Sequence, residues 1–298
     1  MIIKPLSLLL LILTLLPLTS QAQQNPDRQT IENSYHQWRQ AMINKDARRW
    51  QQFTAHHRQI EIRNRAYSER RQFPANVFDL PVAPPDIRKL KALSIRVKGP
   101  TAKAIYFGKV DFGVGGEPTD NLLVVSFLKE GSTWKYALSE FINLSALPAV
   151  RQAIVNGDNS YINQPDFMPD GTLPRPGVTL TGPVPYIAKV YAYCPGREVT
   201  VQVNRLSRHL FQNTQASEVV IGGARDGENQ IEFKIKNIPG GTGQEALTVR
   251  VYLMSEVPGV KPVKAFEYLI NQGQNFTPSA TQTFTITPEI VARLMGRQ

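Results

Sequence analysis

The adjacent histidines His56 and His57 have the clearest capacity for acid–base chemistry in this sequence. Imidazole titrates near neutral pH, so either side chain could serve as a general base. Neighbouring helical residues point about 100° apart, so the pair cannot readily face one metal ion, and no spaced ligand set accompanies it. A solvated helix end is the simpler interpretation, and we expect no metal ion and no cofactor. His36 is expected on a helix flank and His209 on the surface.

Two carboxylates, Asp111 and Glu140, fall on expected strands that should lie close together. A buried pair of acids can separate its two pKa values and divide the roles of acid and base. These two acids and the paired histidines are therefore the candidate catalytic residues. Aromatic side chains that could line the same cavity are the candidate ligand-binding residues, although aromatics at such spacings more often form a core: Tyr35, Trp38, Tyr106, Trp134 and Tyr136.

The formal net charge of +10 is concentrated in one part of the chain. Residues 27–109 carry 17 Lys and Arg against 7 Asp and Glu, and the rest is nearly balanced. The basic side chains Arg63, Arg70 and Arg71 are candidates for binding an acidic glycan, an anionic lipid surface or an acidic protein. Nucleic acid is not expected, because few aromatics accompany the arginines to stack on bases. The alternative is a solvated basic face.

Several classes of site lack their sequence motif. There is no Gly-x-Ser-x-Gly elbow and no Gly-x-x-x-x-Gly-Lys phosphate loop. Cys194 is the only cysteine, which excludes an internal disulfide framework and a Cys-rich zinc site. We expect it to be a small, half-buried apolar residue at a strand end.

Residues 1–22 have the three-part pattern of a cleaved signal peptide. Lys4 supplies a positive start, an apolar run of about 13 residues follows, and small residues precede position 23. The run is shorter than the roughly 20 residues needed to cross a bilayer, which favours cleavage over anchoring. The mature protein is therefore expected to be periplasmic or secreted.

The apolar spacing predicts three helices, over Asp27–Asn44, after the capping residue Asp46, and over about Arg58–Gln72. The period then changes to two and predicts a meander of strands with a short helix behind it: Leu90–Lys98, Thr101–Phe112, Leu122–Lys129, Thr133–Leu144 and the helix Ala146–Val155. Helices followed by an antiparallel sheet indicate an α+β domain over residues 27–155.

Residues 156–185 are rich in Pro, Gly, Asn and Asp and are expected to form a linker. Tyr161, Phe167 and Met168 are unusual for a free tether, so part of it could pack on a neighbour. Residues 186–298 show short strands at close spacing and a final helix capped by Thr287, which indicates a β-sandwich. The seven expected strands are Tyr186–Tyr193, Glu198–Asn204, Ser217–Ile221, Asn229–Ile235, Ala246–Met254, Ala265–Ile270 and Thr281–Thr287.

Three short segments of the N-terminal part resemble the NTF2-like (SnoaL-like) superfamily. They are residues 44–47 before Trp50 (Asn-Lys-Asp-Ala), residues 99–104 (Gly-Pro-Thr-Ala-Lys-Ala) and residues 131–135 (Gly-Ser-Thr-Trp-Lys). The resemblance implies an α+β cone, with helices over a curved antiparallel sheet, a pocket between them, and dimers through the outer face of the sheet. Residues 227–232 resemble the turn and strand of immunoglobulin-like sandwiches.

The superfamily includes isomerases and dehydratases as well as members that only bind or scaffold, so the expected fold does not select a function. With no catalytic set apparent, the leading hypothesis is an exported non-enzymatic binding or scaffold protein with a pocket, a basic helical face and an accessory β-sandwich. The alternative is an isomerase, dehydratase or hydrolase that uses acid–base residues in the cone.

Overall fold

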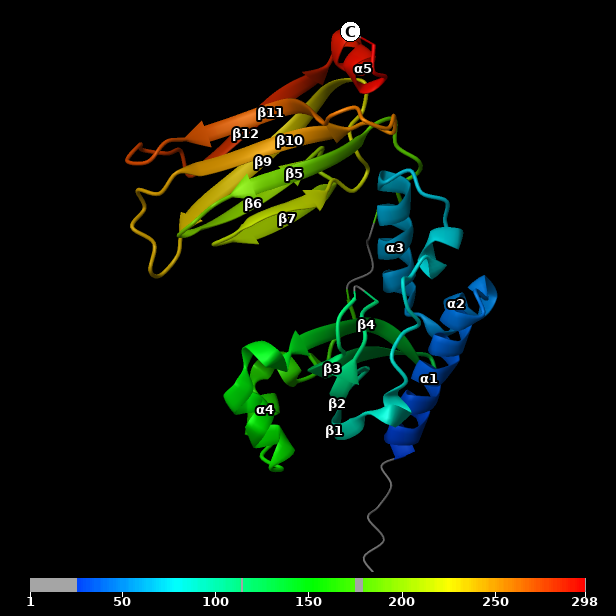
Figure 1. Ribbon diagram of the computed structural model, residues 1–298. Coiled ribbons are helices and arrows are strands. Elements are labelled where there is room, and N and C mark those ends of the chain that lie inside the picture. Colours follow the sequence, from blue (N-terminus) through cyan, green and yellow to red (C-terminus); the bar gives the residue numbers. More distant parts are fainter. Residues whose placement is uncertain (1–25, 114, 175–178, 298) are drawn as a thin grey trace, which may run out of the picture.

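The computed structural model describes residues 26–113, 115–174 and 179–297 (Figure 1). N-terminal helices pack on a four-strand antiparallel sheet, and two further antiparallel four-strand sheets form a β-rich C-terminal region. The expected signal peptide, residues 1–22, lies outside the described residues. In the part of the chain that the structure describes, no helix has both the length and the apolar character needed to cross a bilayer.

The described part of the chain begins with three helices, α1 (Pro26–Ile43), α2 (Ala47–Phe53) and α3 (His56–Ser68). Asp46 caps α2 as expected, because its carboxylate accepts the N–H of Arg49 at 2.9 Å.

Ala55 precedes α3 and has no side-chain group that could cap this helix. Its first N–H, at His56, is instead donated to a carboxylate oxygen of Glu130 at 2.7 Å. The helix ends at Ser68, earlier than the Gln72 expected from the sequence. The reason is Arg70, whose φ of 54° is left-handed, so that the N–H of Arg71 turns back to the carbonyl of Ala66.

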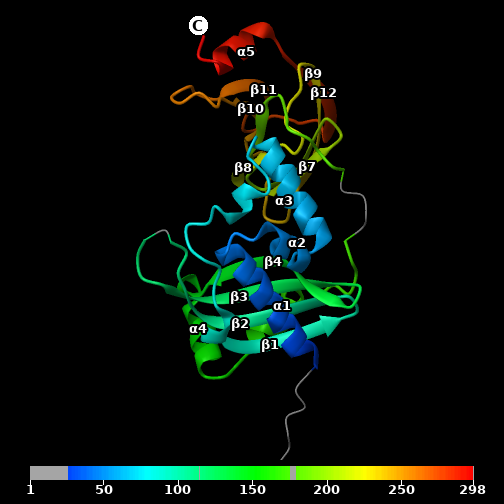
Figure 2. The same cartoon turned by 90° about the vertical axis from the view of Figure 1, so that its right-hand side faces the viewer.

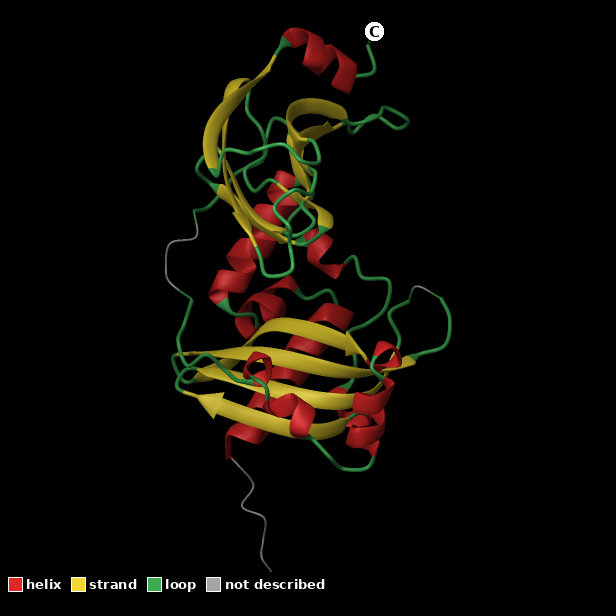
Figure 3. Ribbon diagram, turned by 90° about the vertical axis from the view of Figure 1, so that its left-hand side faces the viewer, coloured by secondary structure: helices red, strands yellow, loops and turns green. Residues whose placement is uncertain are grey.

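The N-terminal sheet has the strand order β1-β2-β3-β4 and matches the expected meander. Its strands are β1 (Lys91–Lys98), β2 (Thr101–Val110), β3 (Thr119–Glu130) and β4 (Thr133–Asn143). Helix α1 lies across one face (Figure 2). Helix α4 (Pro148–Val155) covers the other face (Figure 3).

Part of the expected linker also belongs to this outer layer. Ile162 and Phe167 are buried with Ile154 of α4 against Ile105 and Leu122 of the sheet. The aromatic residues that are unusual for a tether therefore help to close this core. A homodimer through the outer face of the sheet stays a prediction, and it would have to form over α4 and residues 160–167.

The C-terminal region is built from two facing sheets, with the orders β11-β10-β5-β8 and β12-β9-β6-β7. Inward side chains of both sheets form one core of mainly Val, Ile, Leu, Ala and Phe. Its elements are β5 (Ile187–Tyr193), β6 (Arg197–Val203), β7 (Ser207–Gln212), β8 (Gln215–Val219), β9 (Gly227–Asn237), β10 (Leu247–Met254), β11 (Val263–Ile270), β12 (Ser279–Ile286) and α5 (Pro288–Leu294). Strand β7 is not among the seven expected strands, and Thr287 caps α5 as expected.

Helix α3 lies between the N-terminal sheet and the β-rich C-terminal region, and it connects these two halves of the molecule (Figure 1). The side-chain amide of Asn64 donates to the carbonyl of Thr179 at 2.8 Å and accepts the N–H of Thr181 at 3.0 Å. One turn further, the hydroxyl of Ser68 accepts the N–H of Gly222 at 2.9 Å. Both side chains are almost fully buried, so this face of α3 is an interface rather than a solvated surface.

Candidate functional site

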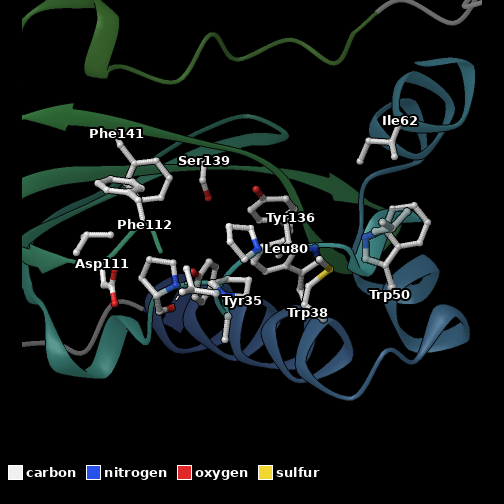
Figure 4. A pocket seen from close by; sticks show the side chains of 18 of the residues that line it. Tyr35, Trp38, Trp50, Ile62, Leu80, Asp111, Phe112, Tyr136, Ser139 and Phe141 are labelled. Atoms are coloured by element: carbon white, nitrogen blue, oxygen red, sulfur yellow. Dashed lines mark hydrogen bonds between the residues drawn. The ribbon is translucent and has the colours of Figure 1, made fainter. Parts of the chain in front are cut away.

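A cavity of about 440 Å³ lies between α1 and the inner face of β4 (Figure 4). This volume falls within the roughly 300–1,000 Å³ typical of small-molecule sites. Its wall is mainly aromatic, aliphatic and proline side chains, completed by Trp50 of α2, by Arg58 and Ile62 of α3 and by the loop 76–85. The arrangement can enclose a small molecule with a largely apolar surface.

One wall comes from α1, whose residues Tyr35, Trp38 and Met42 recur at helical spacing and face the sheet. The proline-rich loop opposite is held to the same helix. The hydroxyl of Tyr35 donates to the carbonyl of Pro85 at 2.9 Å, and Nε of Arg39 donates to the carbonyl of Pro84 at 2.7 Å. These bonds fix the distance between helix and loop.

A second wall comes from β4, where Tyr136, Ser139 and Phe141 face the cavity (Figure 4). Strict alternation would place Tyr136 and Ser139 on opposite faces. The register between β3 and β4 shifts at Ala137, which gives β4 one extra residue and brings both side chains to the inner face. The ring of Tyr136 then stacks on that of Trp38, with centroids 3.7 Å apart.

Three lining residues carry polar atoms that are buried and have no hydrogen-bond partner within the described chain. They are Nε1 of Trp38, Nε of Arg58 and Oδ1 of Asn76. Buried polar side-chain atoms are bonded in the large majority of cases. Of the ten exceptions among the described residues, three belong to residues that line this cavity.

The titratable groups of the cavity are poorly suited to acid–base catalysis. Burial is the main cause that raises the pKa of Tyr35 and that of Tyr136 above the usual phenol range, so both stay protonated at neutral pH. Asp111 is the only carboxylate among the described lining residues, which include no histidine. It is exposed at the end of β2 and accepts the N–H of Gly113 at 2.8 Å.

The other expected pocket residues lie elsewhere. Glu140 pairs with Val124 of β3 and shares its face, which is opposite the cavity, so Asp111 and Glu140 do not form an acid pair. Tyr106 and Trp134 are buried in the core between α1 and the sheet and do not line the cavity. Trp134 donates from Nε1 to the carboxylate of Asp27 at 3.3 Å.

His56 and His57 occupy the first turn of α3 and are not lining residues of the cavity. His56 is exposed beside a separate cleft of about 420 Å³. His57 is partly buried, and its Nδ1 has no hydrogen-bond partner among the described residues. In the described ranges, no group of three or more His, Cys, Asp or Glu could hold a metal ion.

His57 leads to a pH prediction. Burial lowers the pKa of its imidazole below 6.5, and the neighbouring charges oppose one another, since Glu61 and Glu130 raise that pKa while Arg58 and His56 lower it. As the pH falls from 7 to 5, the unfolded chain takes up this proton first, so the free energy of unfolding decreases. We expect the stability of His57→Gln to decrease less over this range, measured by urea unfolding at both pH values. An equal decrease in the two proteins would contradict the assignment.

The arginines proposed to attract an anionic partner are engaged within the chain. Arg63 donates to the carbonyl of Thr181 at 3.2 Å and lies over the ring of Tyr67. Arg70 pairs with Glu256 of the C-terminal region at 2.7 Å. The third, Arg71, pairs at 3.2 Å with Glu69, the residue that follows α3. An anionic partner for this face stays a prediction, and two of its three arginines also hold the halves together.

A constellation that no sequence motif indicates lies in the C-terminal region. Nε2 of His209 contacts the hydroxyl of Ser207 at 2.8 Å, and Nδ1 contacts the carboxylate of Glu218 at 2.8 Å. This is the order of atoms in a serine–histidine–acid triad. However, the Ser207 hydroxyl is buried and accepts the N–H of Ile221 at 2.7 Å, which leaves no path to a substrate.

The expectation that His209 is a surface residue is wrong, because only 4% of it is exposed. Its ring joins β7 of one sheet to β8 of the other and satisfies both of its nitrogens. The residues around His209 are mostly polar, so the sequence pattern does not indicate strand β7. The buried Cys194 is closer to its expectation: burial raises its thiol pKa, which leaves it in the unreactive thiol form.

Comparison with known proteins gives no match to this chain, whether with protein-family models, with curated proteins or with solved structures.

Proposed function

We propose that the chain is an exported, non-enzymatic binding protein whose N-terminal unit holds a small, mainly apolar ligand. The observation that carries the proposal is the cavity between α1 and β4, which is lined by stacked aromatic side chains and closed by a loop pinned to Tyr35 and Arg39. Export rests on the sequence pattern of residues 1–22.

The chemistry of the lining supports binding rather than turnover. A general base works best with a pKa near the operating pH, whereas the raised pKa values of Tyr35 and Tyr136 keep both phenols neutral. Asp111 has no second acid beside it in the described lining. An enzyme of the isomerase, dehydratase or hydrolase type would have to depend on this one carboxylate.

We also propose that the N-terminal unit is an NTF2-like cone and the C-terminal region an immunoglobulin-like sandwich. Helices over one face of a four-strand antiparallel sheet, with an extra residue at Ala137 in β4, support the first assignment. Two facing antiparallel sheets around one apolar core support the second. In this proposal the sandwich is an accessory unit held by α3.

The proposal is tested with N-phenyl-1-naphthylamine, an uncharged probe whose fluorescence rises in apolar surroundings. We expect saturable binding to the full chain and at least about a tenfold weaker affinity for Ser139→Trp, because the new ring would occupy the cavity. Glu140→Trp is the matched control. It introduces the same side chain one residue further along β4 on the opposite face, and should bind like the wild type.

Equal affinities of the wild type and Ser139→Trp, with both proteins folded by circular dichroism, would place the probe elsewhere and end the proposal. A separate assay, of ligand turnover, addresses the enzyme alternative. If the protein transforms a bound ligand and Asp111→Asn abolishes this turnover while binding persists, the non-enzymatic assignment is incorrect.

A further inference from the structure

The cavity is not uniformly apolar. Two of its lining residues present buried N–H donors without a partner in the described chain, Nε1 of Trp38 and Nε of Arg58. Trp38 is 7% exposed, so solvent does not satisfy its indole N–H. A ligand that left these donors unpaired would forgo about 1–3 kcal/mol at each of them.

Both donors belong to residues that neighbour Tyr136. Trp38 stacks on Tyr136 at 3.7 Å, and the positive charge of Arg58 acts on the Tyr136 hydroxyl, whose pKa it lowers against the larger effect of burial. The carboxylate of Glu61 pairs with one Nη of Arg58 at 3.1 Å. Nε of the same guanidinium is buried and has no partner among the described residues.

The negative charge of the cavity is at its other end. Asp111 lies beside Phe112 and Phe141, away from Ile62, which follows Arg58 by one turn of α3 (Figure 4). The Asp111 carboxylate is exposed and already accepts a backbone N–H. The cavity is thus polarised along its length, with its positive charge at the α3 end.

We propose that the ligand carries an anionic head group, such as a carboxylate or sulfonate, which binds Nε of Arg58 and Nε1 of Trp38 while an apolar body lies along Tyr136 and Phe141. This inference rests on the proposed ligand-binding function and specifies its chemical class. A negative oxygen accepts both N–H groups in bonds about twice as strong as neutral ones. Asn76, with its free Oδ1, provides an acceptor for a protonated or hydroxylated neighbour of the head group.

The test compares two probes with the same phenylnaphthylamine body. 8-Anilinonaphthalene-1-sulfonate carries an anionic group, and N-phenyl-1-naphthylamine does not. For Arg58→Gln we expect about a tenfold loss of affinity for the sulfonate and less than a twofold change for the uncharged probe. Arg65→Gln is the matched control, since Arg65 is an exposed arginine of the same helix that pairs with Glu69 and does not line the cavity.

Arg58→Lys keeps the positive charge and should recover part of the sulfonate affinity. No recovery would attribute the loss to packing and overturn the anionic head group. Unchanged sulfonate affinity in Arg58→Gln, while the uncharged probe still binds and Ser139→Trp still weakens it, overturns this inference alone. Failure of both probes to bind overturns the inference and the proposed function together.

Discussion

Replacing Phe233 with alanine is expected to lower the free energy of unfolding of the C-terminal region by about 3–5 kcal/mol, the usual cost of removing a buried phenyl ring. Phe233 is fully buried on β9. Its ring lies 4.3 Å from that of Tyr268 on β11, so it joins the two sheets. The matched control is Leu210→Ala, because Leu210 is 58% exposed and its truncation should change stability by less than about 0.5 kcal/mol.

The measurement can also separate the two halves. All three tryptophans, Trp38, Trp50 and Trp134, lie in the N-terminal part. Tryptophan fluorescence therefore reports that part, whereas circular dichroism reports both. If residues 27–155 and 186–298 are separate folding units, Phe233→Ala moves one dichroism transition in urea and leaves the fluorescence midpoint unchanged. A shift of both signals to the same lower midpoint would show one cooperative unit and contradict the expected domains.

Replacing Asn64 and Ser68 together with alanine is expected to release the C-terminal region from α3. The two side chains make hydrogen bonds with Thr179 and Thr181 of the expected linker, just before β5, and with Gly222 of the C-terminal region. Asn64 is 2% exposed and Thr181 is 7% exposed, so the loss of the Asn64 side chain leaves the buried N–H of Thr181 unpaired, at about 1–3 kcal/mol. Among the described residues, the other hydrogen bond and ion pair at this interface are the Arg63 bond to Thr181 and the exposed pair of Arg70 with Glu256, and exposed ion pairs contribute little.

Small-angle X-ray scattering should show a larger radius of gyration for this double variant and a broader distance distribution. The tryptophan unfolding midpoint should stay near the wild-type value, because the cavity and the sheet are untouched. Asn44→Ala is the control, since Asn44 is an exposed asparagine near the end of α1. Superimposable scattering curves of the double variant and the wild type would show that these bonds do not hold the halves together.

The elements with local signals were predictable. Asp46 and Thr287 cap α2 and α5 because a side-chain oxygen placed before a helix accepts its free N–H groups. The strands of the N-terminal sheet follow an apolar period of two and lie within a few residues of their expected bounds. These features depend on neighbours in the sequence, so the sequence displays them.

The features that were missed depend on distant partners. Strand β7 contains Ser207 and His209, whose polarity suggested a loop, and only Glu218 and the N–H of Ile221 make their burial favourable. Helix α3 ends at a left-handed Arg70 where a glycine would have been the visible signal. No local pattern marks either case.

The cavity was partly predictable. Tyr35, Trp38 and Tyr136 were expected to line it because aromatic residues recur on the inward faces of α1 and β4. Its loop wall was not expected, because that wall depends on bonds from α1 to carbonyls about fifty residues away in the chain. No sequence pattern distinguishes Arg58 from the other arginines of residues 27–109, and only its place in the cavity wall separates it from them.

Helix α3 couples movement at the cavity to the hydrogen bonds at the C-terminal region. The segment from Arg58 at the cavity to Ser68 at the sandwich spans about 15 Å at 1.5 Å per residue, so a tilt of about 10° about the cavity end displaces Ser68 by about 2.6 Å. A displacement of that size breaks the bond with Gly222. A ligand wide enough to push α3 outward is therefore opposed by hydrogen bonds that it never touches, and the C-terminal half helps to set the largest ligand that the cavity admits.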